Sequence, residues 1–201
     1  MDQAEPVWIA RAQKGSSEAF THLVEVYQTP VYNLCSRMLG DAYEAEDAAQ
    51  ETFLRAYQNL RRYDDQRSFS TWLLSIAAHY CIDQIRKRRM PLVSLDDTPY
   101  LDPPDQEPGP EASLGRREEQ KRIEVLLSTL TAQDRAVVVM RYWYDLSYEE
   151  IAESLSMSVS AVKSRLHRAR LSLAQNWVDQ ESKAQLIKER SRDGKVHSPA
   201  F

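Results

Sequence analysis

Residues 146–173 read LSYEEIAESLSMSVSAVKSRLHRARLSL, and this stretch predicts two short helices joined by a tight turn. Ser147 and Glu150 have the spacing of a capping box, in which a hydroxyl and a carboxylate bond the free N–H groups of a starting helix. Ser158 can cap the second helix. Its apolar residues recur on one face: Val162, Leu166, Ala169 and Leu173. In a helix-turn-helix of this kind, the second helix enters the DNA major groove.

The opposite face of this second helix carries small polar and basic side chains and no acid. An ordinary amphipathic helix with a solvated basic face would show the same pattern. The capped partner helix and the short turn favour DNA recognition instead, because the major groove accepts a helix with such a face. The candidate DNA-binding residues are Ser160, Lys163, Ser164, Arg165, His167, Arg168 and Arg170.

The composition predicts an all-helical protein whose contact with DNA is local. The chain has 201 residues, with 26 Lys and Arg against 30 Asp and Glu, which gives a net charge of −4. Proteins that coat nucleic acid indiscriminately are usually basic. Glycine is scarce, alternating β patterns are absent, and helix-forming residues are plentiful.

Several function classes are disfavoured by what the sequence does not contain. We find no nucleophile–base constellation, Gly-rich phosphate loop or metal-ligand spacing, so we expect no catalytic residues, no cofactor and no metal site. No run of about 18 apolar residues occurs, so we expect no membrane insertion. Cys35 and Cys81 each stand alone in an apolar stretch, which is typical of buried thiols in the reducing cytoplasm.

The chain divides into two small helical domains joined by a linker. Residues 1–90 form the first domain, in which Pro30 predicts a kink or break and Gly40 a helix end. Residues 91–114 hold six of the nine prolines and no basic residue, which predicts a flexible acidic linker. Residues 115–177 form the second domain. Residues 178–201 form a C-terminal tail, where Leu186 and Ile187 can extend a helix.

Three segments together resemble bacterial group IV sigma factors, the extracytoplasmic-function (ECF) class of the sigma-70 family. EAEDAAQETFLRAY (44–57) resembles region 2.2. RSFSTWLLSIAAHYCIDQIRKRR (67–89) resembles regions 2.3 and 2.4, and LSYEEIAESLSMSVSAVKSRLHRAR (146–170) resembles region 4.2. They stand in the family's order around a variable linker. The first domain is thus similar to sigma-2, which opens the promoter −10 element, and the second to sigma-4, which reads the −35 element.

The resemblance implies partners and further site residues. Core RNA polymerase is the expected partner, with its β′ clamp helices on the region 2.2 helix and its β flap on the second domain. The implied clamp residues are Asp47, Gln50, Glu51 and Arg55. The implied −10 residues are Tyr63, Arg67, Phe69, His79, Asp83, Arg86, Lys87 and Arg88. Promoter DNA is the second partner. An anti-sigma factor that masks both domains is common in the family and is expected here.

Two positions depart from the family pattern. His79 stands where the family often has Asn, and imidazole offers one donor and one acceptor in place of an amide's pair. Ser156 stands in the turn where the family often has Gly, so a left-handed conformation there would cost about 1 kcal/mol. The alternatives to a sigma factor are a helix-turn-helix regulator that acts without polymerase, which lacks a visible dimer or receiver pattern, and an enzyme.

Overall fold

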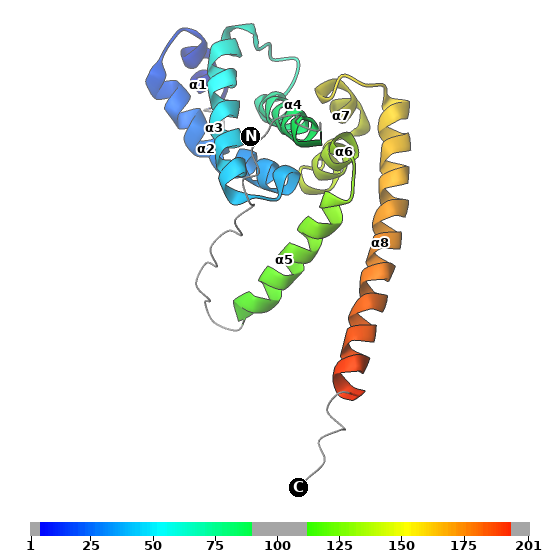
Figure 1. Cartoon of the computed structure of the whole chain (residues 1–201). Coiled ribbons are helices and arrows are strands. Elements are labelled where there is room, and N and C mark those ends of the chain that lie inside the picture. The colour runs from blue at the N-terminus through cyan, green and yellow to red at the C-terminus, as the bar shows by residue number, and fades with distance from the viewer. Residues whose placement is uncertain (1–4, 90–111, 194–201) are drawn as a thin grey trace, which may run out of the picture.

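The structure, a computed structural model, describes residues 5–89 and 112–193 and contains only helices within them (Figure 1). The first domain consists of α1 (Glu5–Gln13), α2 (Ser17–Leu39), α3 (Ala42–Asn59), the 3₁₀ helix η1 (Leu60–Arg62) and α4 (Phe69–Arg89). The second domain consists of α5 (Ala112–Ser128), α6 (Ala132–Trp143), α7 (Tyr148–Ser154) and α8 (Val159–Asp193). The all-helical fold class is therefore confirmed.

The core of the first domain lies between α2, α3 and α4, which contact one another. Leu23, Leu34 and Leu73 are fully buried there, each contributing about 1.5–3 kcal/mol by leaving water. Cys35 and Cys81 are free thiols and are buried in the same core, as expected. A hydrogen bond to Cys35, followed by burial, raises the pKa of the Cys81 thiol. Both cysteines thus serve as small apolar residues.

The second domain is built around the helix-turn-helix, with α8 lying against α5, α6 and α7. Val162, Leu166 and Ala169 are buried, which confirms the apolar stripe predicted for this helix. Leu173 is half-buried against the same core. Because the stripe occupies one side only, the polar side of α8 is left facing solvent.

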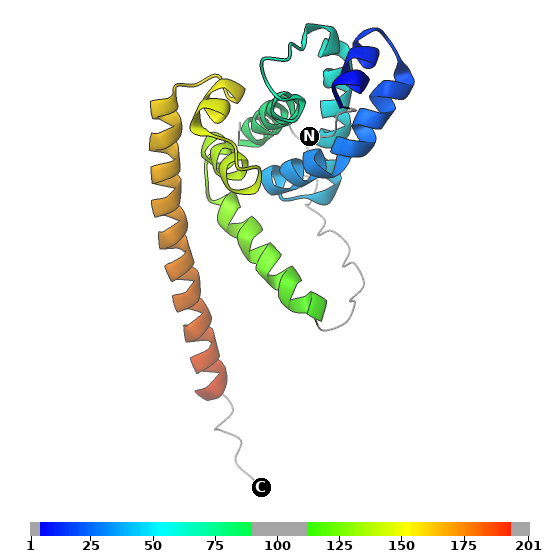
Figure 2. The same cartoon turned by 180° about the vertical axis from the view of Figure 1, so that it is seen from behind.

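The two domains pack directly against each other, although the sequence suggested two separate modules. Helices α6 and α7 contact α4, and α6 also contacts α2, as both views show (Figures 1 and 2). The buried Arg135 of α6 donates from Nη1 to the carbonyl of Met38 at 2.5 Å. The hydroxyl of Tyr144 donates to the carbonyl of Pro30 at 2.5 Å. The buried apolar residues of both domains consequently form one continuous cluster.

Side chains satisfy the free backbone groups at several helix ends, and the predicted roles of Gly40 and of the Ser147–Glu150 capping box are confirmed. The Ser16 hydroxyl accepts from the amide of Ala19 at 3.2 Å and begins α2, and Gly40 ends that helix with φ 74°. Thr131 caps α6 in the same way. Ser147 and Glu150 form the complete capping box at the start of α7.

Helix α2 continues through Pro30, so of the kink or break expected at that position the break does not occur. The helix continues for nine residues beyond it to Leu39. Proline removes only one backbone donor, and Val31, Leu34 and Met38 on the following turns are fully buried. Their packing holds the helix together across the missing hydrogen bond.

Ser156 adopts the left-handed conformation, with φ 52°. The amide of Met157 donates to the carbonyl of Ala152 at 2.8 Å, and the amide of Ser156 donates to Glu153 at 3.2 Å. These two bonds form a Schellman motif at the end of α7. The turn thus has the geometry that favours glycine, and serine occupies it at some cost in free energy.

Two helices extend beyond the expected domain limits. α5 begins at Ala112, inside the range 91–114 assigned to the linker, and α8 continues through the expected tail to Asp193. The predicted flexibility of the linker falls on residues outside those that the structure describes. Among the described helices, none combines the length and the apolar composition that crossing a membrane requires.

We predict that Ser156→Gly raises the free energy of unfolding by about 1 kcal/mol, because glycine adopts positive φ without a Cβ clash. Chemical denaturation of the full chain measures this change. Ser158→Gly is the matched control and should lower stability, because it removes the hydroxyl that caps α8. A Ser156→Gly protein less stable than the wild type would contradict the strain assigned to this turn.

Candidate nucleic-acid and polymerase interfaces

The exposed side of α8 carries most of the side chains predicted to contact −35 DNA. Ser158 caps this helix, because the amide of Ala161 donates to its hydroxyl oxygen at 3.2 Å. Lys163 also lies over the ring of Tyr148 in α7, with 5.7 Å from Nζ to the ring centroid. Four exposed residues at helical spacing form what we call the recognition face: Ser160, Lys163, Ser164 and His167.

Arg165, by contrast, is used to hold α8 against α6. Its Nη1 donates to Oδ1 of Asp134 at 2.7 Å, and its Nη2 donates to Oε1 of Gln133 at 2.5 Å. Asp134 is 9% exposed and also accepts from the hydroxyl of Thr131 at 2.7 Å. A buried carboxylate needs such partners. Arg165 therefore positions the recognition face and is not free to contact DNA in this arrangement.

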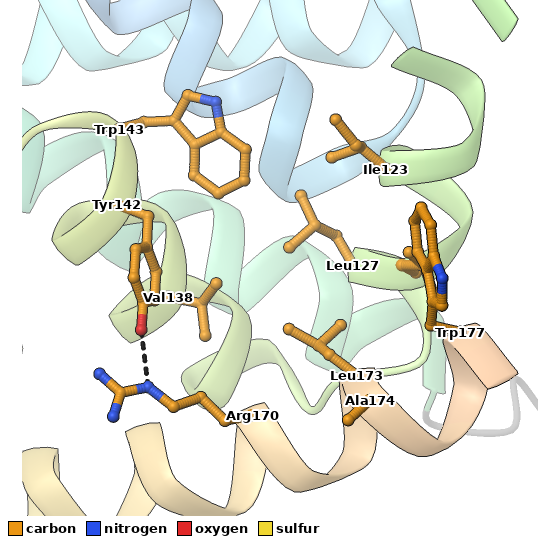
Figure 3. Close-up of a pocket in the computed structure, with 10 residues that line it drawn as sticks. Ile123, Leu127, Val138, Tyr142, Trp143, Arg170, Leu173, Ala174 and Trp177 are labelled. Carbon is orange, nitrogen blue, oxygen red and sulfur yellow. Dashed lines mark hydrogen bonds between the residues drawn. The ribbon is translucent and has the colours of Figure 1, made fainter. Parts of the chain in front are cut away.

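The two remaining arginines of the predicted set lie on different sides of α8. Arg168 has a side chain that is 61% exposed and stands 3.9 Å from Asp134, so it remains available beside the recognition face. Arg170 donates from Nε to the hydroxyl of Tyr142 at 2.6 Å (Figure 3). This bond turns Arg170 toward α6, away from the other predicted DNA-binding residues.

The loop 63–68, predicted to lie beside the melted −10 strand, is held by hydrogen bonds at both ends. Gln13 of α1 donates from Nε2 to the carbonyls of Leu60 and Tyr63, at 3.1 Å and 2.8 Å. The Tyr63 hydroxyl donates to the carbonyl of Arg67 at 2.7 Å. Burial, with the charge of Glu5, raises the pKa of Tyr63 and keeps this donor protonated. No spacing or periodicity indicates that Gln13 supports this loop, because its partners lie 47 and 50 residues away.

Phe69 is placed under the loop and not on its surface. It is 2% exposed and packs against the rings of Tyr27, Tyr63 and Trp72, with centroids 5.4–5.5 Å apart. Such aromatic clusters contribute packing energy beyond the burial of area. Phe69 is therefore removed from the residues that contact DNA in this arrangement, and it supports the loop instead. Trp72 is half-buried in the same cluster.

His79 is exposed on α4, and its ring is oriented by the helix backbone. Its Nδ1 lies 2.8 Å from the carbonyl oxygen of Ser75. A carbonyl can only accept, so Nδ1 carries the proton in this bond. In the neutral ring Nε2 then presents a lone pair to solvent. His79 thus offers an acceptor to a base, where an asparagine would offer both an acceptor and a donor.

The C-terminal end of α4 is basic and only partly neutralised. Arg88 forms an ion pair with Glu44 at the start of α3, and Arg86 stands 3.9 Å from Asp83. Lys87 is exposed. Four of the predicted −10 residues therefore lie together at this end of α4, on the surface of the first domain: Asp83, Arg86, Lys87 and Arg88.

The residues predicted to bind polymerase share one face of α3. Asp47, Gln50 and Glu51 line a shallow depression together with Leu54 and Tyr80. Arg55 lies at its edge, bonded to Glu51 at 2.7 Å and placed over the ring of Tyr80 at 4.8 Å. Leu54 is 51% exposed and was missed, although positions 47, 50, 51 and 54 have the spacing of one helical face.

An apolar groove of about 400 Å³ lies on the second domain between α5, α6 and α8 (Figure 3). Ile123, Leu127 and Leu173 form its floor, and the exposed rings of Tyr142 and Trp177 stand at its rim. Arg122 lies over the Trp177 ring at 3.5 Å. None of the four residues of the recognition face lines the groove, so the two surfaces do not overlap.

Family models match both domains. Residues 23–90 match Sigma-70 region 2, and residues 120–173 match Sigma-70, region 4. SigW, an ECF RNA polymerase sigma factor of Bacillus subtilis, is 38% identical over 179 residues, which cover 85% of this chain and 95% of SigW. The chain belongs to the ECF class of sigma-70 family RNA polymerase sigma factors.

Other relatives agree with this assignment. The RNA polymerase sigma-H factor of Pseudomonas aeruginosa is 34% identical, over 81% of this chain and 88% of its own length. Among solved structures, CnrH in complex with the cytosolic domain of CnrY matches with a TM-score of 0.66 and 25% identity, over 88% of this chain and 99% of CnrH. The domain order and the overall arrangement are therefore shared with known members.

As a sigma factor, the protein is a non-enzymatic initiation factor that directs RNA polymerase to start transcription at specific promoters. Its region 4 helix-turn-helix binds DNA. This assignment sets aside the alternative of a regulator that works without polymerase. Among the described residues, no group of three or more His, Cys, Asp and Glu side chains is placed to hold a metal ion.

We predict that Arg165→Ala and Lys163→Ala weaken −35 binding for different reasons. Arg165→Ala leaves the buried Asp134 short of a partner and should lower the free energy of unfolding by about 1–3 kcal/mol. Lys163→Ala should leave stability unchanged within about 0.5 kcal/mol. Thermal unfolding and binding to promoter DNA, measured side by side, separate the two effects. Equal stability of the two variants would contradict the positioning role of Arg165.

Proposed function

We propose that the two domains read the two promoter elements with the surfaces described above, while polymerase holds them at the required separation. The observation that carries this proposal is the presence, in one chain, of an outward recognition face on α8 and a preorganised loop at the start of α4, a helix whose opposite end is basic. Each surface alone reads few base pairs. Tethering both to one polymerase raises the effective concentration of each at its site.

For the −35 element, we assign base and phosphate contacts to the recognition face and Arg168. Lys163, His167 and Arg168 supply the charge for phosphates, and the serine hydroxyls are short enough to let α8 approach the groove closely. Arg165 and Arg170 bond residues of α6 and thereby fix the orientation of α8 about its own axis. The net charge of −4 disfavours indiscriminate binding by the free factor.

For the −10 element, we assign the reading of a flipped base to the space between the loop 63–68 and His79. The carbonyl-bound Nδ1 leaves Nε2 as an acceptor, which suits a base that presents an amino group. Arg67, Arg86, Lys87 and Arg88 are placed for the backbone of the melted strand. Tyr63 contributes a ring edge beside this space, because its hydroxyl already donates a hydrogen bond to the carbonyl of Arg67.

For polymerase, we assign the β′ clamp helices to the α3 face and the β flap to the apolar groove. The α3 face combines acidic groups with the exposed Leu54, which suits a partner that is basic and partly apolar. The groove offers aromatic rims and an apolar floor, the features of a surface that receives an apolar helix. It lies clear of the recognition face, so DNA and flap can be held together.

We also propose a protein partner of the anti-sigma class and action in the cytoplasm, where core polymerase is found. The structurally similar CnrH is solved in complex with the cytosolic domain of CnrY. A partner of that kind would cover surfaces that polymerase and DNA need. Its identity does not follow from the residues of this chain.

We predict that His79→Asn changes the preferred base at a single −10 position, because an amide presents a donor as well as an acceptor. Core polymerase with each protein is supplied with sheared genomic DNA, and the transcript starts are mapped by sequencing. Core polymerase alone is the control and should give no specific starts. No added starts with the wild-type protein would overturn the promoter-reading proposal.

We predict that Asp47→Lys weakens binding to core polymerase by at least about tenfold, or about 1.4 kcal/mol. The reason is that it reverses a charge at the centre of the α3 face. Glu46→Lys makes the same change on an exposed neighbour outside that face and serves as the control. Fluorescence titration with core enzyme measures both. Equal affinity of the two variants would refute the clamp assignment.

A further inference from the structure

The loop 63–68 is held at its entrance by one side chain of α1. Gln13 is half-buried at the last position of that helix, and its Nε2 donates to the carbonyl oxygens of Leu60 at 3.1 Å and of Tyr63 at 2.8 Å. An amide nitrogen carries two hydrogens, so one group serves both carbonyls. Gln13 thus bridges the start of η1 and the first residue of the loop.

The bond to the Tyr63 carbonyl decides the direction in which the chain enters the loop. A peptide unit is planar and trans, so its carbonyl and the following amide point in opposite directions. Because the carbonyl of Tyr63 points at Gln13, the amide of Asp64 points away from α1. A rotation of this peptide would break the bond to Gln13 and move every loop residue that follows.

The exit of the loop is fixed as well, which leaves a short exposed tip. The Tyr63 hydroxyl donates to the carbonyl of Arg67 at 2.7 Å. The Ser68 hydroxyl oxygen accepts from the amide of Thr71 at 3.2 Å and begins α4. Residues 64–66, between these two attachments, are exposed. The position of this tip therefore depends on the two ends of the loop, and Gln13 holds the first of them.

Helix α1 is a firm support for Gln13, because it packs along α2. Ile9 and Ala12 are buried in the core of the first domain. The rings of Trp8 and His22 lie with their centroids 4.7 Å apart. Helix α1 contacts both α2 and η1. The Gln13 amide is therefore held in place by the packing of its own helix, and it transfers that fixed position to the loop.

We infer that Gln13 is a positioning residue for −10 recognition, which fixes the first peptide of the loop 63–68 and thereby sets the base that the loop selects. The inference rests on the proposed function of this loop. Base edges are read through hydrogen bonds that weaken steeply with misalignment, so a displaced tip discriminates poorly between bases. Two donors are required at position 13, because both of its partners are carbonyl oxygens.

Three substitutions separate the donors of Gln13 from its bulk. Gln13→Met keeps an unbranched side chain without a donor, and Gln13→Glu places a carboxylate, which only accepts, against the two carbonyls. Gln13→Lys restores donors and is the rescue variant. Gln28→Glu is the matched control, because the exposed Gln28 of α2 makes a similar bond, from Nε2 to the carbonyl of Glu25 at 3.3 Å, away from the loop.

The conformation of the loop is measured first, in the full chain without DNA or polymerase. Hydrogen exchange of the amides of residues 63–67 should be at least about fivefold faster in Gln13→Met and Gln13→Glu, because the loop opens more often when its entrance is released. Exchange in α2 and α4 should stay unchanged, which shows that the domain is folded. Gln13→Lys and Gln28→Glu should behave as the wild type. Unchanged loop exchange in both Gln13→Met and Gln13→Glu would overturn the inference.

Base selection is measured next, with core polymerase, sheared genomic DNA and each protein, by sequencing the transcript starts. At one −10 position the ratio of the preferred base to the next should fall by about five- to tenfold in Gln13→Met and Gln13→Glu and recover in Gln13→Lys. Base frequencies at the −35 element should stay the same. Wild-type starts with unchanged −10 ratios in the variants would overturn this inference alone. No specific starts with the wild type would overturn the proposed function, and this inference with it.

Discussion

The burial of α4 on two sides is the constraint on which the rest of the structure depends. Its buried residues occupy most of its circumference, and they are covered by α2 and α3 on one side and by α6 and α7 on the other. The loop 63–68 and the basic residues at the end of α4 are fixed in place through this helix. The loop 63–68 and the recognition face are accordingly coupled through one continuous core.

Local chemistry in the sequence was sufficient to predict the helix ends and the inward face of α8. Ser147, Glu150, Gly40 and the Val162 row act within one or two turns of their own helix, so their roles follow from spacing. The positions of the Arg165 and Phe69 side chains depend on contacts with residues that are distant in the sequence. Asp134 lies 31 residues before Arg165, and Tyr27 lies 42 residues before Phe69, beyond the reach of any periodicity.

The packing of the domains escaped prediction for the same reason. A helix in a two-domain protein normally buries one face, whereas α4 has buried residues around most of its circumference. No local spacing in α6 marks Arg135 as an interdomain residue, yet it is 6% exposed and bonds a carbonyl 97 residues away. The composition of the linker suggested that the two domains are separate. Composition does not indicate whether two folded surfaces bind each other.

The continuity of α8 joins the recognition face to Asp193 within one helix. Its 35 residues span about 50 Å at 1.5 Å per residue. Asp134 and the groove residues hold its N-terminal half, and the remainder of the helix extends from the fold in both views (Figures 1 and 2). Because α8 is long, a rotation of about 5° around its anchored half displaces its C-terminal end by several ångströms. The direction of the C-terminal half of α8 is therefore tied to the orientation of the recognition face.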